Sequence, residues 1–153
     1  MKHVFESASD EETRAIGAKI AAEIAALAAP PRLLILTGDL GAGKTTLVKG
    51  IVAALAAEDE DAVTSPTFTL VHSYEGWSEG RPVTVLHLDL YRLEDERQLA
   101  TLGLAEMAAA DDALVLVEWG ERFPSVRELA DGSIRIETTG PQSRRITLEM
   151  KTA

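Results

Sequence analysis

Residues 33–46, which read LLILTGDLGAGKTT, decide the fold of this chain. The first four residues form a continuous apolar run, which is typical of a short strand buried on both faces of a sheet. From Gly38 to Thr45 the chain has glycine, four residues, glycine, lysine and threonine, the spacing of a phosphate-binding P-loop. Residues 45–57 then carry apolar side chains at helical spacing. A strand, a glycine-rich loop and a helix in this order predict an α/β fold.

The chemistry of this loop follows from its residue types. Glycines let the backbone wrap closely around phosphate oxygens with N–H groups pointing inward, and the following helix adds the positive end of its dipole. Lys44 is expected to reach the β- and γ-phosphates, the Thr45 hydroxyl to coordinate Mg²⁺, and Thr46 to hold the α-phosphate. A glycine-rich turn that merely joins strand to helix would leave Lys44 unexplained. The predicted nucleotide-binding residues are Gly38, Gly41, Ala42, Gly43, Lys44, Thr45 and Thr46.

Length and composition predict a single domain over residues 1–153, because 46% of the side chains are hydrophobic and 26% are charged. With no cysteine, the chain has neither disulfides nor thiolate zinc ligands and suits a reducing compartment. The first residues turn acidic at 10–12 without a signal peptide's apolar stretch, and no apolar run reaches the roughly 18 residues of a membrane span. We therefore expect a cytoplasmic protein that neither enters nor crosses a membrane.

The charge balance is acidic: 25 carboxylates against 15 lysines and arginines leave a net charge of −10. The basic residues do not cluster in the sequence, so this surface repels a phosphate backbone. Tight, direct binding of nucleic acid by this chain alone is therefore not expected. The excess of acid serves either solubility or contact with a basic partner surface.

Periodicity and turn residues outside the loop predict the rest of a P-loop NTPase-like, three-layer α/β sandwich. Helices flank a mostly parallel central sheet that has an antiparallel edge and a C-terminal β-hairpin. A capping box at Ser9 and Glu12 opens the first helix. The other expected strands cover 3–6, 68–74, 83–91 and 114–117, and a pair lies around 134–136 and 146–150. A hairpin connection over 75–82 joins the strands at 68–74 and 83–91. The other expected helices cover 9–27 and 95–110.

Two carboxylates stand where expected strands end. Glu118 follows the apolar run 114–117, the Walker-B arrangement with glutamate in place of aspartate, and is expected to bind Mg²⁺ directly or through water. Alternatively, Glu118 is a strand-end carboxylate that faces solvent. The neighbouring Trp119 either packs in the core or forms a contact surface near the nucleotide.

Strand alternation over residues 85–92 places His87, Asp89 and Tyr91 on one face and three leucines on the other. A polar face on a buried strand needs a reason. Asp89 is the candidate for orienting an attacking water or a metal-bound water, and structural hydrogen bonding is the alternative. His87 is expected to be a hydrogen-bonded structural residue, and Arg92 to anchor Asp89 or a neighbouring acid.

The segment Thr64-Ser65-Pro66-Thr67-Phe68 lies between the loop helix and the next strand. Many P-loop proteins keep a segment that senses the γ-phosphate at this place, and the hydroxyls of Ser65 and Thr67 suit that task. The same residues also make a good turn into a strand.

Taken together, four motifs resemble the bacterial TsaE (YjeE) family. They are GDLGAGKTT at residues 38–46, SPTF at 65–68, HLDLYRL at 87–93 and EW at 118–119. Their order and spacing match the family, and the resemblance covers nearly the whole chain. The chain departs from the family pattern at Leu88, where phenylalanine is common, and in a roomy hairpin over residues 76–82.

The resemblance implies the ATPase of the bacterial machinery that places threonylcarbamoyl on the adenosine next to the anticodon, in tRNAs that read codons beginning with A. It implies ATP and Mg²⁺ as cofactors and docking on the TsaB–TsaD pair, with tRNA contacted only through that complex. Hydrolysis, weak without partners, would support turnover of the TsaD transferase. Lys44 and Thr45 would bind phosphate and magnesium, Glu118 the metal, and Asp89 would serve hydrolysis, with Trp119 in the functional set.

Three other functions stay open at this point. In a small-molecule P-loop kinase, Asp89 would activate a substrate hydroxyl while Arg122 and Arg127 close over the phosphates, but the chain looks short for an acceptor pocket and a lid. A GTPase switch would need a guanine-reading Asn-Lys-x-Asp segment, which is absent from the sequence. A nucleotide-dependent assembly switch without catalysis would need only the loop. The sequence does not identify the residues that bind the purine base. The start of the first helix near Asp10 and the turn at 140–142 are possible contacts, but nothing in their spacing is diagnostic.

Overall fold

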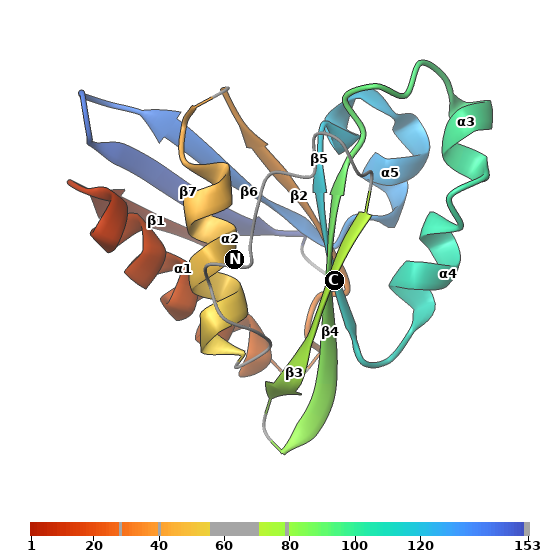
Figure 1. The fold of residues 1–153 in the computed structure, drawn as a ribbon, viewed down its shortest axis with the longest axis horizontal. Coiled ribbons are helices and arrows are strands. Elements are labelled where there is room, and N and C mark those ends of the chain that lie inside the picture. The colour runs from red at the N-terminus through yellow and green to blue at the C-terminus, as the bar shows by residue number, and fades with distance from the viewer. Residues whose placement is uncertain (28, 40, 56–70, 79, 152–153) are drawn as a thin grey trace.

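The computed structural model describes residues 1–27, 29–39, 41–55, 71–78 and 80–151 (Figure 1). Across these residues one seven-stranded sheet runs in the order β1-β7-β6-β2-β5-β4-β3. The four inner strands β6, β2, β5 and β4 are parallel, and antiparallel pairs flank them on both sides. The strands are β1 (Lys2–Ser7), β2 (Leu33–Gly38), β3 (Val71–Ser78), β4 (Arg81–Asp89), β5 (Ala113–Glu118), β6 (Gly132–Thr138) and β7 (Arg144–Met150).

Helices cover both faces of the sheet and make three layers, which confirms the predicted fold class (Figure 1). One face carries α1 and α2, and the other carries the three shorter helices and a 3₁₀ turn. No helix in the described ranges is long and apolar enough to cross a membrane. The helices are α1 (Asp10–Ala25), α2 (Lys44–Ala54), α3 (Glu96–Ala100), α4 (Leu104–Ala109) and α5 (Pro124–Leu129), with the 3₁₀ turn at Gly120–Arg122.

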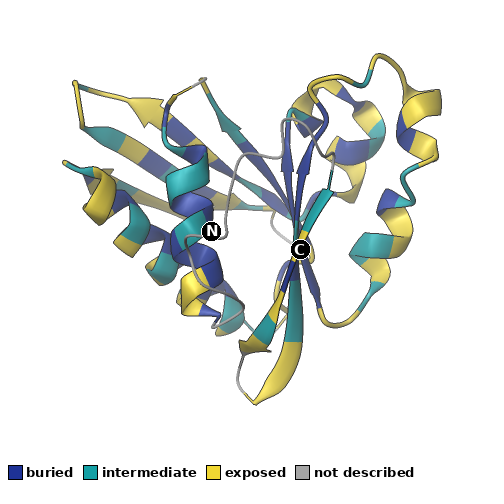
Figure 2. Ribbon diagram, in the orientation of Figure 1, coloured by how far each residue is buried: buried dark blue, intermediate teal, exposed yellow. Residues whose placement is uncertain are grey.

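The core lies on both sides of β2 and β5, the two central strands, which are buried along most of their length (Figure 2). β5 is buried at every position, because helices cover it from above and below. The residues of β2 and β5 therefore divide by alternation between two apolar clusters, one under α1 and α2 and one under α3 to α5. This arrangement brings the ends of β2, β4 and β5 to one edge of the sheet.

The first helix begins as its sequence predicts. The Ser9 hydroxyl accepts the N–H of Glu12 at 3.1 Å, and the Glu12 carboxylate accepts the N–H of Ala8 at 2.5 Å. These two bonds form a capping box in which the return bond reaches one residue further back than usual. The helix ends at Ala25, two residues before the expected end.

Three predictions of secondary structure are wrong. The single helix over 95–110 is two short helices, because Gly103 takes a left-handed conformation with φ at +72°. The predicted hairpin is confirmed by the antiparallel pairing of β3 and β4, but its expected bounds of 75–82 are too wide, since the two strands pair as far as Ser78 and Arg81. The strand expected to include Tyr91 ends at Asp89, and α5 was not predicted. Residues 68–70 of the expected strand over 68–74 lie outside the described ranges.

Candidate functional site

The loop between β2 and α2 has the backbone of a phosphate cradle. Gly41 and Gly43 have left-handed φ angles of +80° and +107°, which a residue with a side chain rarely adopts. Gly43 is the N-cap of α2 and provides no side-chain hydrogen bond to the first turn. Thr45 and Thr46 lie half-buried in that turn. No side chain of the N-cap therefore caps the N–H groups at this helix end, and their binding of an anion stays a prediction.

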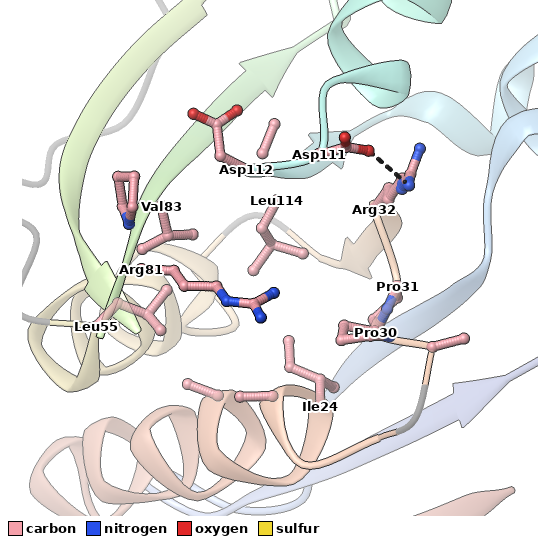
Figure 3. A pocket seen from close by; sticks show the side chains of 15 residues that line it. Ile24, Pro30, Pro31, Arg32, Leu55, Arg81, Val83, Asp111, Asp112 and Leu114 are labelled. Atoms are coloured by element: carbon pink, nitrogen blue, oxygen red, sulfur yellow. Dashed lines mark hydrogen bonds and ion pairs between the residues drawn. The ribbon is translucent and has the colours of Figure 1, made fainter. Parts of the chain in front are cut away.

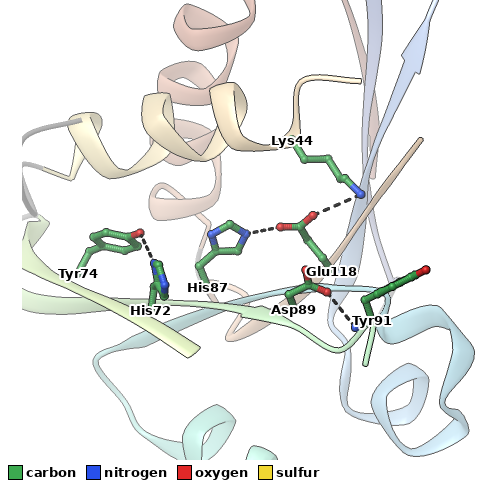
Figure 4. Close-up of polar contacts among 7 residues, drawn as sticks. All are labelled: Lys44, His72, Tyr74, His87, Asp89, Tyr91 and Glu118. Atoms are coloured by element: carbon green, nitrogen blue, oxygen red, sulfur yellow. Dashed lines mark hydrogen bonds and ion pairs between the residues drawn. The ribbon is translucent and has the colours of Figure 1, made fainter. Parts of the chain in front are cut away.

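Lys44 and Glu118 meet at the end of this loop (Figure 4). The Lys44 ammonium lies 3.3 Å from a carboxylate oxygen of Glu118, and only 10% and 7% of the two side chains is exposed. The other Glu118 oxygen lies 2.6 Å from Nε2 of the fully buried His87. Glu118 is thus not the solvent-facing carboxylate that was one alternative. β5 positions Glu118, β4 positions His87 and the first turn of α2 positions Lys44.

The pKa of Glu118 lies below its ordinary value. Burial raises it, but the hydrogen bond from His87, the charge of His87 and the charge of Lys44 together lower it by more. The carboxylate is therefore held in its charged form. A buried anion with one lysine and one histidine as neighbours is suited to bind a divalent cation or to hold the lysine in place.

Asp89 lies directly beside Glu118. The two residues end the neighbouring parallel strands β4 and β5 and are paired in register. Asp89 is 9% exposed, and one of its carboxylate oxygens accepts the N–H of Tyr91 at 2.8 Å. The structure therefore brings together Lys44, Glu118, His87 and Asp89 from three separated segments, on the sheet face that α2 covers.

An aromatic group borders the charged residues. Trp119 follows Glu118 with a left-handed φ of +65°, and the Lys44 ammonium lies 5.4 Å from its ring centroid. The Tyr91 ring lies 5.1 Å from that of Trp119. The core-packing alternative for Trp119 is supported, because the half-buried ring packs against the apolar cluster under α3 to α5, while its contact with the nucleotide stays a prediction. Tyr91 is 59% exposed beyond the end of β4, so its predicted place on the polar strand face is wrong.

Arg122, a candidate to close over the phosphates in the kinase alternative, binds backbone carbonyl oxygens in the structure. Its Nη2 atom donates to the carbonyl oxygens of Leu90, Tyr91 and Leu93. The guanidinium thereby holds the turn that follows β4 and lies 5.7 Å from the Trp119 ring centroid. Sequence reasoning missed this role because the three acceptors are backbone atoms, which no residue pattern distinguishes.

The roles of three predicted site residues stay predictions. Ser65 and Thr67, expected to sense the γ-phosphate, lie outside the described residues. Arg92, expected to anchor Asp89 or a neighbouring acid, is exposed in the turn after β4. In the described ranges no cluster of three histidine, aspartate or glutamate side chains could hold a metal alone. Magnesium at a P-loop commonly takes one or two protein ligands and completes its shell with phosphate and water, so Thr45 and Glu118 fit that donor set.

A cavity of about 590 Å³ opens at the other end of the sheet (Figure 3). It lies between the ends of α1 and α2 and the beginnings of β2, β4 and β5. Arg81 points into it, and Arg32 pairs with Asp111 at its rim at 3.0 Å. None of the predicted nucleotide-binding or catalytic residues lines this cavity.

Comparison with known proteins agrees with these features. The family model described as "Threonylcarbamoyl adenosine biosynthesis protein TsaE" matches residues 7–146. A protein of Bacillus subtilis, named tRNA threonylcarbamoyladenosine biosynthesis protein TsaE, is 39% identical over 147 residues, which cover 94% of this chain and 82% of that protein. The protein of the same name from Aquifex aeolicus is 40% identical, covering 74% of each chain.

Relatives and solved structures extend this agreement. The TsaE protein of Mycobacterium tuberculosis is 34% identical over 140 residues, covering 89% of this chain and 79% of its own. The crystal structure of Bacillus subtilis YdiB superposes with a TM-score of 0.66 at 29% identity and covers 98% of this chain and 86% of that one. The chain therefore belongs to the TsaE family of threonylcarbamoyl adenosine biosynthesis proteins.

Proposed function

We propose that this protein is a magnesium-dependent ATPase of the cytoplasm that acts as the accessory component of the tRNA threonylcarbamoyladenosine modification complex. Its hydrolysis of ATP would support turnover of the TsaB–TsaD transferase. One observation carries the proposal: the buried group of Lys44, Glu118 and His87, with Asp89 in register beside it, closes the end of a phosphate-binding loop.

The loop and α2 would bind the phosphates. The Gly41–Gly43 backbone and the first turn of α2 direct N–H groups to the α- and β-phosphates, and Thr46 adds its hydroxyl. Lys44 would leave Glu118 and pair with the β- and γ-phosphates, because a charged phosphate oxygen replaces the carboxylate as its partner. Thr45 and the released Glu118 would hold Mg²⁺, which neutralises the charge of the phosphate oxygens.

Asp89 would orient the water that attacks the γ-phosphate. It lies at the end of the strand next to Glu118, and its N–H bond from Tyr91 fixes the direction of the carboxylate. His87 keeps Glu118 in place while Lys44 exchanges partners, since its 2.6 Å bond uses the other carboxylate oxygen. The Trp119 ring covers Lys44 from one side and limits the approach of bulk water.

The partners are proposed from the family and from the charge. A net charge of −10 disfavours direct contact with tRNA, so tRNA would be bound by the TsaB–TsaD pair. A small-molecule kinase gains no support, because Arg122 and Arg127, the candidates for closing over the phosphates, donate to backbone carbonyl oxygens instead. A nucleotide-dependent assembly switch would use the same loop without hydrolysis.

ATP turnover with and without the organism's TsaB–TsaD complex, measured together with tRNA modification, tests the proposal. We expect slow turnover by the chain alone and faster turnover in the complex. An absence of stimulation, together with modification that does not depend on this chain, would overturn the proposed function.

Asp89→Asn separates hydrolysis from binding. Asparagine keeps the oxygen that accepts the Tyr91 N–H but loses the charge, so the turn after β4 is preserved. We expect ATP hydrolysis to fall by about 100-fold or more, while ADP affinity measured by calorimetry stays within a few-fold. Asp112→Asn, at an exposed position on the other end of the sheet, is the control. Full tRNA modification without hydrolysis would favour the assembly switch instead.

A further inference from the structure

Arg144, the first residue of β7, reaches the phosphate loop from the C-terminal hairpin. The turn between β6 and β7 lies at the same edge of the sheet as the loop between β2 and α2 (Figure 1). Arg144 Nε donates to the carbonyl oxygen of Ala42 at 2.8 Å, across 102 residues of sequence. Nη1 of the same guanidinium donates to the carbonyl oxygens of Gly140 and Ser143 at 3.3 and 2.9 Å. One side chain thus joins the hairpin turn to the loop.

The bond to Ala42 fixes a peptide unit of the loop. In a planar trans peptide the carbonyl and the following N–H point in opposite directions. When Arg144 holds the Ala42 carbonyl on the side of β7, the N–H of Gly43 is directed away from β7. This N–H belongs to the N-cap of α2, where the loop is expected to surround phosphate.

The surroundings of Gly43 agree with this role. A Cβ atom added at Gly43 would lie 4.0 Å from Arg144 Nε and 3.9 Å from the Thr13 methyl group. The side chains of Arg144 in β7 and Thr13 in α1 therefore lie on the side of Gly43 where a Cβ atom would be. Gly43 has a φ of +107°, and glycine can adopt many other backbone conformations. Contacts around the loop are therefore needed to keep Gly43 in this one.

Among the described residues, no carboxylate pairs with the charge of Arg144. Within the described residues its hydrogen-bond acceptors are three carbonyl oxygens and no carboxylate. The adjacent Arg145 differs, because it pairs with the exposed Glu6 at 2.9 Å. In a chain of net charge −10, a cation beside the loop favours an anionic ligand there.

We propose that Arg144 is a positioning residue of the phosphate loop, which directs the Gly43 N–H toward bound phosphate and adds positive charge behind it. This inference rests on the proposed binding of ATP and concerns a residue outside every motif of the loop. It also assigns the β6–β7 hairpin a part in nucleotide binding.

Arg144→Met removes the donors and keeps the aliphatic stem. Loss of one charge-assisted contact predicts ADP binding that is weaker by about 10- to 100-fold in calorimetry. Arg144→Lys, which keeps the charge and a single donor, is expected to recover part of the affinity. Arg145→Met, one residue along the same strand, is the matched control and should bind within about twofold of the unchanged protein. Unchanged affinity in folded Arg144→Met, or equal losses at both arginines, would overturn the proposal.

The chemical shift of the Gly43 amide proton gives a second measurement. Its response to ADP would not change if Arg144 only stabilised the fold. Selective ¹⁵N-glycine labelling yields a spectrum of 11 glycines, in which the Gly43 proton is expected to shift downfield when ADP binds. This shift should be lost in Arg144→Met, reduced in Arg144→Lys and kept in Arg145→Met. If the unchanged protein binds no ADP, the proposed function fails. In that case the free Gly43 signal still tests Arg144, since it should change in Arg144→Lys and not in Arg145→Met.

Discussion

The charged side chains at the two ends of the sheet differ in how far they are buried. At the end that carries the glycine-rich loop, buried Lys44 and buried His87 both contact buried Glu118, and Asp89 is buried beside them. At the other end lies the 590 Å³ cavity, where the Asp111 side chain at the rim is 93% exposed. Burying charged groups costs free energy unless they are paired. A buried group of charges therefore points to a function, whereas an exposed ion pair does not.

This difference shows that burial of charge, and not cavity volume, identifies the candidate site. A P-loop binds phosphate in a shallow cradle of backbone N–H groups, which leaves little enclosed volume. Parallel strands bring their carboxyl ends to this edge, where ligands bind in open α/β sheets. The cavity lies at the opposite edge, where β2, β4 and β5 begin.

Lys44→Ala should have the largest effect of the variants that test this comparison. It removes the cation that pairs with Glu118 and is expected to pair with phosphate, so ADP affinity should fall by about 100-fold or more, near 3 kcal/mol. Calorimetry measures the change. Lys49→Ala, on the same helix, is the control and should bind normally. Equal affinity for Lys44→Ala and the unchanged protein would remove the loop from the site.

Glu118→Gln should have a smaller effect that depends on pH. Because the folded-state pKa of Glu118 is below its ordinary value of 4.5, the charged group stabilises the fold above that pH. The contribution is lost as the pH falls below 4.5 and through the folded-state pKa. Urea unfolding should therefore show the wild-type protein losing its stability advantage over Glu118→Gln as the pH is lowered through and below 4.5. A difference that stays constant over this range would contradict the assigned pKa shift.

Asp111→Ala should have the smallest effect. Its ion pair with Arg32 is exposed, so the free energy of unfolding should change by no more than about 0.5 kcal/mol. ADP affinity should not change, because the cavity end is separated from the loop by the length of the strands. A clear loss of ADP affinity would mean that the two ends of the sheet are coupled.

The parts that could be predicted from the sequence are local in the chain. The strand, loop and helix of residues 33–54 are contiguous, and their apolar spacing and glycines carry the information. The capping box at Ser9 and the two carboxylates at strand ends could be predicted for the same reason. The helix break at Gly103 was missed because an isolated glycine inside a helical pattern is often tolerated.

The sequence by itself determined the fold class, the phosphate loop and the candidate residues Lys44, Asp89 and Glu118. Only the tertiary structure decided which of these side chains meet: His87 and Lys44 take opposite oxygens of Glu118, and Arg144 holds the Ala42 carbonyl. The reason is physical. Backbone conformation follows from neighbours a few residues away, whereas these contacts depend on strand order and on which helix packs over which strand.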